Sequence, residues 1–341
     1  MIQICISIQE PTHAAEVRRR ALGIARELSF DEVSAGNVGL VVTEAATNIL
    51  KHGRGGQMLL RSLAANSHNH GIEVLALDKG PGIADMTRCF EDGYSTAGSA
   101  GTGLGAIARL SDFHEIYSSR SHGTALLAQL WKNGRGAAPN GDGRRFRCGG
   151  ISVPVHGEQE CGDSWAFQEA QDYSRTTVAD GLGHGPQAAL ASQAAIATAG
   201  ERLAVPLPAL LDQIHGALRS TRGAAVGVAD IDPEKRVVRF AGVGNISALV
   251  MPESGSARHL VSSAGTAGHA VRKIQEFMYP WDSQSLLVLH SDGLQTHWSF
   301  DPYPGLRERH PSLIAGVLYR DYSRGRDDVT VVVVREANRK A

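Results

Sequence analysis

The segment EAATNILKH carries an acid, an amide and two basic side chains at helical spacing. These side chains stand at positions i, i+4, i+7 and i+8, so one helix would present all of them on one face: Glu44, Asn48, Lys51 and His52. Such a set is unusual beside apolar neighbours such as Val41 and Ile49. It indicates a binding or catalytic face, and the alternative that this segment leaves open is a solvated charged face.

A carboxylate at the end of an apolar strand is a second candidate. Asp78 closes the run IEVLALD and is followed at once by Gly80-Pro81-Gly82. A buried carboxylate at such a strand end can accept a hydrogen bond from the exocyclic amine of a nucleobase. The alternative interpretation is an aspartate that only shapes a turn.

A glycine-rich loop precedes a predicted helix in the segment GTGLGA. Gly101, Gly103 and Gly105 frame this loop, where backbone N–H groups and the helix dipole suit a polyphosphate. The loop is not a Walker A motif, because no GK[ST] follows it. With the helical face and Asp78, the loop indicates an ATP pocket.

Acids of the second half of the chain form a separate set. They lie in the segments GDSW, DGLGHG, SDG and RDDVT, each beside a glycine or a strand end: Asp163, Asp180, Asp292 and Asp327. Mg²⁺ and Mn²⁺ prefer such carboxylate oxygens, and two ions can hold one hydroxide for in-line attack on a phosphoester. A single Asp-Gly pair usually marks a turn, so the argument depends on the set. The doubled acid leaves Asp328 as the alternative to Asp327.

Hydrophobic periodicity predicts the elements that must position the first set. Strands are expected at 2–8, 57–64, 72–78, 113–119 and 124–131, and helices at 12–28, 31–52 and 104–111. This order predicts an α+β unit with one sheet and helices on one of its faces.

The second half reads as a larger α+β unit after a linker rich in Gly, Asn and Arg. Strands are expected at 149–155, 164–169, 173–180, 225–231, 236–242, 246–251, 285–290 and 328–335, and helices at 186–203, 207–220 and 311–321. This pattern predicts two packed sheets covered by helices. The predicted domains are 1–133 and 148–336, joined by the linker 134–147.

Composition limits the class of protein. The chain has 341 residues, 42% hydrophobic content and a net charge of -1, which favours two globular domains and argues against nucleic acid or an anionic membrane as partner. The N-terminus lacks a signal-peptide layout, and the four cysteines show no CxxC spacing. We therefore expect a cytoplasmic protein with reduced thiols.

The N-terminal motifs, in this order, resemble the GHKL ATPase and kinase family, most of all its small bacterial anti-sigma and switch serine kinases of the RsbW/RsbT type. The resemblance spans about residues 1–131 and implies that Glu44 polarises a water or an acceptor hydroxyl and that Asn48 holds Mg²⁺ against the phosphates. It also implies that Asp78 binds adenine with support from Thr124. The other implied nucleotide-binding residues are Lys51, Gly80, Gly82, Gly101, Gly103 and Gly105.

The C-terminal motifs resemble the SpoIIE/RsbX-like bacterial branch of the PPM metal-dependent serine/threonine phosphatases. This resemblance covers about 148–336, includes the block AGVGN at 241–245, and implies an α-β-β-α sandwich. It implies that Asp180 bridges two Mg²⁺ or Mn²⁺ ions with help from the Gly181 carbonyl. Asp292 and Asp327 would complete the shell of one ion, and Asp163 would orient bound water.

Together the resemblances imply a bacterial partner-switching regulator. It would dephosphorylate phosphoserine or phosphothreonine on a STAS-type anti-sigma antagonist, and its ATP-binding domain would act as a serine/threonine kinase in the same pathway. In the alternatives, the ATPase-like domain only senses nucleotide, or it is an adaptor that binds a sigma-factor regulator. A homodimer is compatible with either role.

Overall fold

The computed structural model describes residues 3–66, 69–83, 103–120, 122–134 and 145–337. The chain forms two compact units. Unit 1 comprises Met1–Arg144 and Phe300–Arg320, and unit 2 comprises Arg145–Ser299 and Asp321–Ala341. A stretch of the second half of the sequence therefore belongs to the first unit. The predicted domain boundaries at 133/134 and 147/148 stay predictions.

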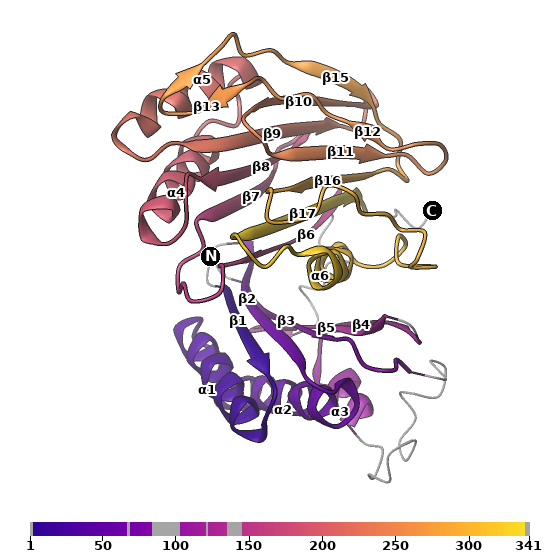
Figure 1. The fold of residues 1–341 in the computed structure, drawn as a ribbon. Coiled ribbons are helices and arrows are strands. Elements are labelled where there is room, and N and C mark those ends of the chain that lie inside the picture. The colour runs from indigo at the N-terminus through magenta and orange to yellow at the C-terminus, as the bar shows by residue number, and fades with distance from the viewer. Residues whose placement is uncertain (1–2, 67–68, 84–102, 121, 135–144, 338–341) are drawn as a thin grey trace. The chain divides into compact units, whose positions relative to one another are not determined.

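Unit 1 contains one antiparallel sheet in the order β1-β2-β3-β5-β4. Its strands lie close to the predicted ranges: β1 Gln3–Ile8, β2 Gly56–Asn66, β3 Asn69–Asp78, β4 Phe113–Ser119 and β5 Gly123–Trp131. One face of this sheet is covered by α1 Pro11–Glu27, α2 Glu32–Asn48 and α3 Gly103–Leu110 (Figure 1). The α+β prediction for this half is confirmed.

Apolar residues at helical spacing hold α1 and α2 on the sheet. Val17 and Ala21 of α1, and Val38 and Val42 of α2, are fully buried in the core beneath the sheet. Asp31 caps the start of α2, because its carboxylate accepts a hydrogen bond of 2.8 Å from the backbone N–H of Ser34.

The end of α2 differs from the prediction of a helix over 31–52. The α-helix ends at Asn48 and continues as a π-helical turn, Ile49–Gly53. The wider turn rotates the side chains that follow Asn48 relative to those of the α-helix. Glu44 and Asn48 therefore share one helical face as predicted, whereas the prediction that Lys51 and His52 lie on the same face is wrong. The turn brings the backbone close to β3: a Cβ added at Gly53 would lie 2.6 Å from the Asp78 Cβ.

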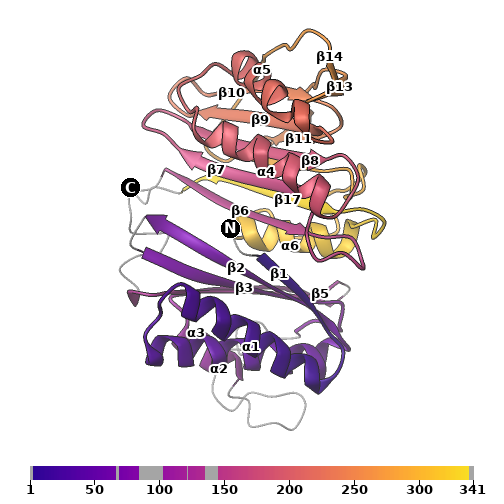
Figure 2. The same ribbon diagram turned by 90° about the vertical axis from the view of Figure 1, so that its left-hand side faces the viewer.

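The opposite face of the same sheet is covered by α6, Pro311–Tyr322, which lies far along the chain. Figures 1 and 2 show this helix against the face that α1–α3 leave open. The approach is close, because a Cβ added at Gly316 would lie 2.6 Å from Leu75 Cδ2 and 3.1 Å from Leu77 Cδ2. The sequence pattern predicted α6 but not its partner.

Unit 2 contains two five-stranded sheets in the orders β15-β10-β9-β8-β7 and β12-β11-β16-β17-β6. The strands are β6 Phe146–Val153, β7 Asp163–Glu169, β8 Ser174–Gly181, β9 Ala224–Asp232, β10 Val237–Val243, β11 Ser247–Met251, β12 Arg258–His259, β15 Phe277–Pro280, β16 Leu286–His290 and β17 Val329–Glu336. One apolar core joins residues of both sheets, among them Trp165, Phe240 and Val332. The predicted sandwich is confirmed.

Helices α4, Pro186–Gly200, and α5, Leu207–Ala217, cover the outer face of the sheet that holds β8 and β9 (Figure 2). Alanines let α4 approach closely: a Cβ added at Gly181 would lie 2.0 Å from the Ala188 carbonyl oxygen. The short hairpin of β13, Gly265–Thr266, and β14, Ala270–Val271, was not predicted, and neither was β15. Among the helices of the described residues, none is long and apolar enough to cross a membrane.

Candidate active sites

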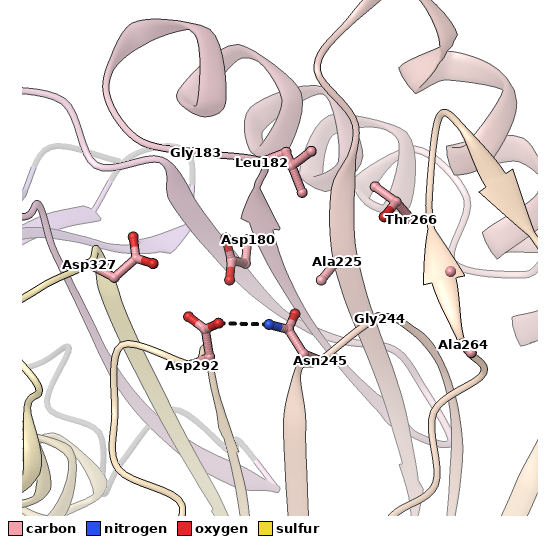
Figure 3. Close-up of a pocket in the computed structure, with 11 residues that line it drawn as sticks. Asp180, Leu182, Gly183, Ala225, Gly244, Asn245, Ala264, Thr266, Asp292 and Asp327 are labelled. Atoms are coloured by element: carbon pink, nitrogen blue, oxygen red, sulfur yellow. Dashed lines mark hydrogen bonds between the residues drawn. The ribbon is translucent and has the colours of Figure 1, made fainter.

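Three of the predicted metal-binding acids line one cavity of about 480 Å³ in unit 2. Asp180 lies at the end of β8, Asp292 follows β16, and Asp327 precedes β17. Their carboxylates face the same space in Figure 3, although they come from distant parts of the sequence. The ends of neighbouring strands therefore bring these acids together.

The fourth acid, Asp163, lies beside this group rather than in the cavity wall. It stands directly opposite Asp180 in the β7–β8 register and is 4% exposed. Ser291 donates a hydrogen bond of 2.6 Å from its hydroxyl to Asp163 Oδ2, and its own oxygen accepts the backbone N–H of Thr330 at 2.9 Å. Asp163 is thus held in place by the strand that leads to Asp292.

Burial and repulsion by neighbouring carboxylates raise the pKa values of Asp163, Asp180 and Asp292. For Asp180 the causes are burial, then the charges of Asp163, Asp292 and Asp327. For Asp292 they are burial and then the charge of Asp327, while Asn245 acts in the opposite direction. Carboxylates that repel one another around one cavity fit a divalent cation, which would relieve that repulsion.

The acids surround the cavity without converging on one point. Within the described ranges, no three His, Cys, Asp or Glu side chains are close enough together to hold a single metal ion. A divalent ion here would therefore require water among its ligands or a movement of side chains. Waters are regular Mg²⁺ ligands, so the donor set still fits the ion.

The structure places the adjacent acids Asp327 and Asp328 in different surroundings. Asp328 accepts hydrogen bonds of 2.7 Å from the backbone N–H groups of Val155 and Gly162. Asp327 lines the cavity. This arrangement favours Asp327 as the ligand and Asp328 as an anchor of the loop before β7.

Sequence reasoning did not find roles for Asn245 and Ser291. Asn245 belongs to the AGVGN block, and its Nδ2 donates a hydrogen bond of 2.7 Å to Asp292 Oδ2 (Figure 3). Ser291 directly precedes Asp292, and that adjacency was the available signal. The backbone N–H of Gly181 donates a hydrogen bond of 3.1 Å to the Gly162 carbonyl. Gly181 is not among the described residues that line the cavity, and its carbonyl contact with a metal stays a prediction.

In unit 1, Glu44 and Asn48 occupy successive turns of α2 and face the start of α3. A Cβ added at Gly103 would lie 2.7 Å from Glu44 Oε2 and 3.6 Å from Asn48 Oδ1. A side chain at position 103 would therefore displace the Glu44 carboxylate where α3 begins. Gly105 is buried within α3, while Gly101 lies outside the described residues.

The side chain of Asn48 has a free hydrogen-bonding group. Its Nδ2 is buried and has no hydrogen-bond partner in the part of the chain that the structure describes. Buried polar groups are usually paired, and this amide could donate a hydrogen bond to a phosphate oxygen or to a water. A Mg²⁺-bound nucleotide with its waters fits this position.

Asp78 closes β3 within a tight frame of backbone. Its Oδ1 accepts the backbone N–H groups of Gly80 at 2.8 Å and Thr124 at 3.2 Å. Burial raises the pKa of this carboxyl, and these hydrogen bonds, Arg320 and His52 act against the rise. The carboxylate oxygens at this strand end are suited to accept a hydrogen bond from a base.

The other predicted nucleotide-binding residues are only partly brought together. Gly80 lies against the π-helical turn, because an added Cβ would be 2.6 Å from the His52 carbonyl oxygen. Gly82 has a φ of +72° and lies beside the end of β4, where an added Cβ would be 2.5 Å from the Ser119 carbonyl oxygen. Lys51 is exposed in the π-helical turn.

Comparisons with known proteins assign the two halves of the chain to two families. Residues 8–130 match the histidine kinase-like ATPase domain family, and residues 170–336 match the family of stage II sporulation protein E (SpoIIE). The chain belongs to the histidine kinase-like ATPase family through an RsbT-like N-terminal domain, which is followed by a SpoIIE/RsbX-like PP2C phosphatase domain. Both predicted resemblances are confirmed.

Individual relatives match separate parts of the chain. The serine/threonine-protein kinase RsbT of Bacillus subtilis (strain 168) is 32% identical over 129 residues, which are 38% of this chain and 96% of that protein. The phosphoserine phosphatase RsbX of the same organism is 29% identical over 140 residues, or 40% of this chain and 69% of that protein. A solved structure from the bacterial stressosome, a modular system adapted to control secondary messenger signaling, has a TM-score of 0.53 at 26% identity and covers 56% of this chain and all of its own.

Proposed function

We propose that this protein is a partner-switching regulator whose unit 2 removes phosphate from phosphoserine or phosphothreonine on a STAS-domain protein. The observation that supports this most is the placement of Asp180, Asp292 and Asp327 around one cavity. RsbX is named as a phosphoserine phosphatase, and a stressosome structure is among the similar ones. The STAS partner itself is inferred from these relatives.

The residues of unit 2 would hold and orient the reacting groups. When bound, Mg²⁺ or Mn²⁺ supplies a water of lowered pKa and neutralises charge on the phosphoryl group. Asp180, Asp292 and Asp327 would hold the ions, and Asp163, fixed by Ser291, would orient water. Asn245 would keep Asp292 in place through its 2.7 Å hydrogen bond.

Apart from the acids, Asn245 and Leu182, the residues that line the cavity are small. They are Gly183, Ala225, Gly244, Ala264, Gly265 and Thr266. Among the residues that the structure describes, those that line this cavity include no lysine or arginine. The metal ions would therefore be the main charges that bind the phosphate. A wall of small side chains leaves room for a phosphorylated loop or turn of another protein.

Unit 1 would phosphorylate a serine or threonine in the same pathway. Glu44 would accept the proton of the attacking hydroxyl, and Asn48 would hold Mg²⁺ against the phosphates. Asp78, with Thr124, would bind adenine, and the relative RsbT is named as a serine/threonine kinase. The orphaned amide of Asn48 supports nucleotide binding more directly than it supports phosphoryl transfer.

A second candidate role for unit 1 is nucleotide sensing without transfer. The contact that favours this role is the hydrogen bond from Arg320, at the end of α6, to the backbone of Asp78. Because α6 leads directly into the segment that carries Asp327, this contact connects the nucleotide site to that segment through the chain. A third candidate role is an adaptor that binds a sigma-factor regulator.

One experiment tests the central proposal. A phosphorylated STAS protein is incubated with the full chain and Mn²⁺ or Mg²⁺, and its phosphate is followed by mass spectrometry. We expect metal-dependent loss of phosphate with the wild-type chain and none with Asp180→Asn. Equal loss with both proteins would contradict the assignment of the cavity.

A further inference from the structure

The segment 300–320 is attached to the sheet of unit 1 by buried polar contacts as well as by apolar packing. Ser312 donates a hydrogen bond of 2.8 Å to Glu73 Oε2, and Glu73 is also bound by Arg61 and Gln129. The backbone N–H of His310 donates to Glu115 at 2.7 Å. These buried hydrogen bonds favour one register of α6 on the sheet.

The last turn of α6 reaches the place where β3 and β5 separate. The β3–β5 ladder ends with the pair Leu77 and Ala125, so Asp78 and Thr124 lie just beyond it. Arg320 Nη1 donates to the carbonyl oxygen of Asp78 at 3.0 Å and to that of Thr124 at 3.3 Å. Arg320 thus joins the two strand ends from the face opposite α1–α3.

The same two residues are joined a second time on their carboxylate side. The Thr124 backbone N–H donates to Asp78 Oδ1 at 3.2 Å. Glycine at position 123 permits this closeness, because an added Cβ would lie 2.2 Å from the Asp78 carbonyl oxygen. The direction of the Asp78 carboxylate therefore depends on how the two strand ends are held.

The chain that follows Arg320 is bound to the turn that carries Asp292. Within unit 2, the Gln295 N–H donates to the Tyr322 carbonyl at 2.9 Å, and the Arg324 N–H donates to the Gly293 carbonyl at 2.9 Å. Asp327 follows three residues after Arg324 in the sequence. A shift of Arg320 along the chain would thus be carried by covalent bonds into the segment that holds Asp327, and by these two hydrogen bonds to the turn that carries Asp292.

We propose that Arg320 is a positioning residue for adenine recognition and that, through it, nucleotide binding in unit 1 is coupled to the segment 321–328 and its paired turn 292–295. Arg320 acts through Asp78 and Thr124 and does not touch the nucleotide. The proposal rests on the proposed nucleotide site. It adds to the nucleotide site a residue that lies, in the sequence, between the phosphatase motifs SDG and RDDVT.

The first test is nucleotide affinity, measured by calorimetry with ATP and GTP at constant Mg²⁺. We expect Arg320→Ala to weaken ATP binding about tenfold and to reduce the preference for ATP over GTP, since the lost interaction is a charge-assisted hydrogen bond. Arg320→Lys, which keeps the charge and a donor, should restore part of the affinity. Arg309→Ala is the matched control, because Arg309 lies in the same segment and pairs with Glu115 at 3.5 Å.

The second test is amide hydrogen exchange with and without ATP at constant Mg²⁺. We expect ATP to slow exchange over 292–295 and 321–328 in the wild type and in Arg309→Ala, and to leave it unchanged in Arg320→Ala. Melting curves establish whether each variant is folded. If Arg320→Ala is unfolded, the same measurements are made on Arg320→Lys.

The outcomes separate this inference from the proposed function. Suppose that Arg320→Ala keeps the ATP affinity and the ATP-dependent hydrogen exchange of the wild type, while Asp78→Asn no longer binds ATP. This result would overturn the role of Arg320 and leave the nucleotide site intact. No ATP binding by the wild type would overturn both the nucleotide site and the coupling. ATP binding with no change in exchange over 321–328 would overturn the coupling.

Discussion

Asp327 and Asp328 are adjacent in the chain but face different surroundings: Asp327 lines the acidic cavity, and Asp328 accepts two backbone hydrogen bonds of 2.7 Å from Val155 and Gly162. Neighbouring residues at a strand entrance point in opposite directions, so only one of them can face the cavity. The sequence motif RDDVT contains both acids and does not distinguish them.

Substitution by asparagine should separate the two acids. Asp327→Asn should lower Mn²⁺ affinity and phosphatase activity by about a hundredfold, with little change in the melting temperature of the metal-free protein. Asp328→Asn should lower stability by about 1–3 kcal/mol, because the amide nitrogen cannot accept one of the two backbone N–H groups. Calorimetry with Mn²⁺ and thermal melting measure both effects, and the reverse pattern would exchange the two roles.

The raised pKa values in the cavity predict the pH dependence of the metal-free protein. Burial and then the charges of Asp163, Asp292 and Asp327 raise the pKa of Asp180 above 3.8. A carboxyl with a raised folded pKa stabilises the fold below its unfolded pKa, and this stabilisation is lost as pH rises through the folded pKa. We therefore expect the melting temperature of the metal-free protein to fall between about pH 5 and about pH 8 more steeply than that of Asp180→Asn.

Metal binding should have the opposite pH dependence. Protons must leave the acids before a cation binds, so Mn²⁺ affinity should increase with pH and binding should release protons. The rise in melting temperature on adding Mn²⁺ should be larger at about pH 8 than at about pH 6. A stabilisation by Mn²⁺ that does not change with pH would contradict a role for protonated acids in the free site.

Much of the fold was predictable because its elements depend on local patterns. Val17, Ala21 and Ile24 mark the buried face of α1, and the run VTVVVV of β17 is buried on both faces, as its composition indicates. The cavity acids were predictable for a related reason: each lies near a strand end, and Asp180 and Asp292 are also followed by a glycine, where the chain turns at the edge of a sheet.

The features that were missed depend on distant contacts. Helix α6 is apolar enough to be predicted, but nothing in its sequence names the sheet of unit 1 as the surface for Ser312 and Gly316. The π-helical turn after Asn48 depends on the close approach of Gly53 to Asp78 on another strand. The same holds for Asn245, whose role appears only when its strand is placed beside Asp292.

The buried Glu73 should make a large contribution to the stability of unit 1. Burial opposes its ionisation, but the charges of Arg61 and His310 and the hydrogen bonds from Gln129 and Ser312 lower its pKa below 4.5. Glu73→Gln should destabilise the fold by about 3–5 kcal/mol, because Arg61 would remain buried without a carboxylate. Ser312→Ala, which removes one hydrogen bond to α6, should cost about 1 kcal/mol.

The effect of Glu73→Gln should also depend on pH. A carboxyl with a lowered folded pKa stabilises the fold above its unfolded pKa, near 4.5, and this stabilisation is lost as pH falls through the folded value. The difference between the wild type and Glu73→Gln should therefore be full at about pH 6 and shrink below about pH 4.5. Denaturant unfolding across this range measures it. Glu115→Gln, at the partly exposed pair with Arg309, is the control and should cost less than about 1 kcal/mol.

The last prediction separates phosphoryl transfer from nucleotide sensing in unit 1. Glu44 lies one helical turn from Asn48 and faces the start of α3, where a hydroxyl acceptor and the terminal phosphate would meet. If Glu44 is the general base, Glu44→Ala should bind ATP normally and phosphorylate a STAS partner about a hundredfold more slowly. Asn48→Ala should instead weaken Mg²⁺-ATP binding.

The assay requires an Asp180→Asn background, because an active phosphatase would remove the product as it forms. Phosphate on the partner is followed by mass spectrometry, and ATP affinity is measured separately by calorimetry. Absence of partner phosphorylation with Glu44 intact would contradict kinase activity toward that partner. If ATP still changes the phosphatase rate of the single variant Glu44→Ala, unit 1 acts as a nucleotide sensor. Sensing needs the bound nucleotide and the Arg320 contact, but it does not need a proton acceptor at position 44.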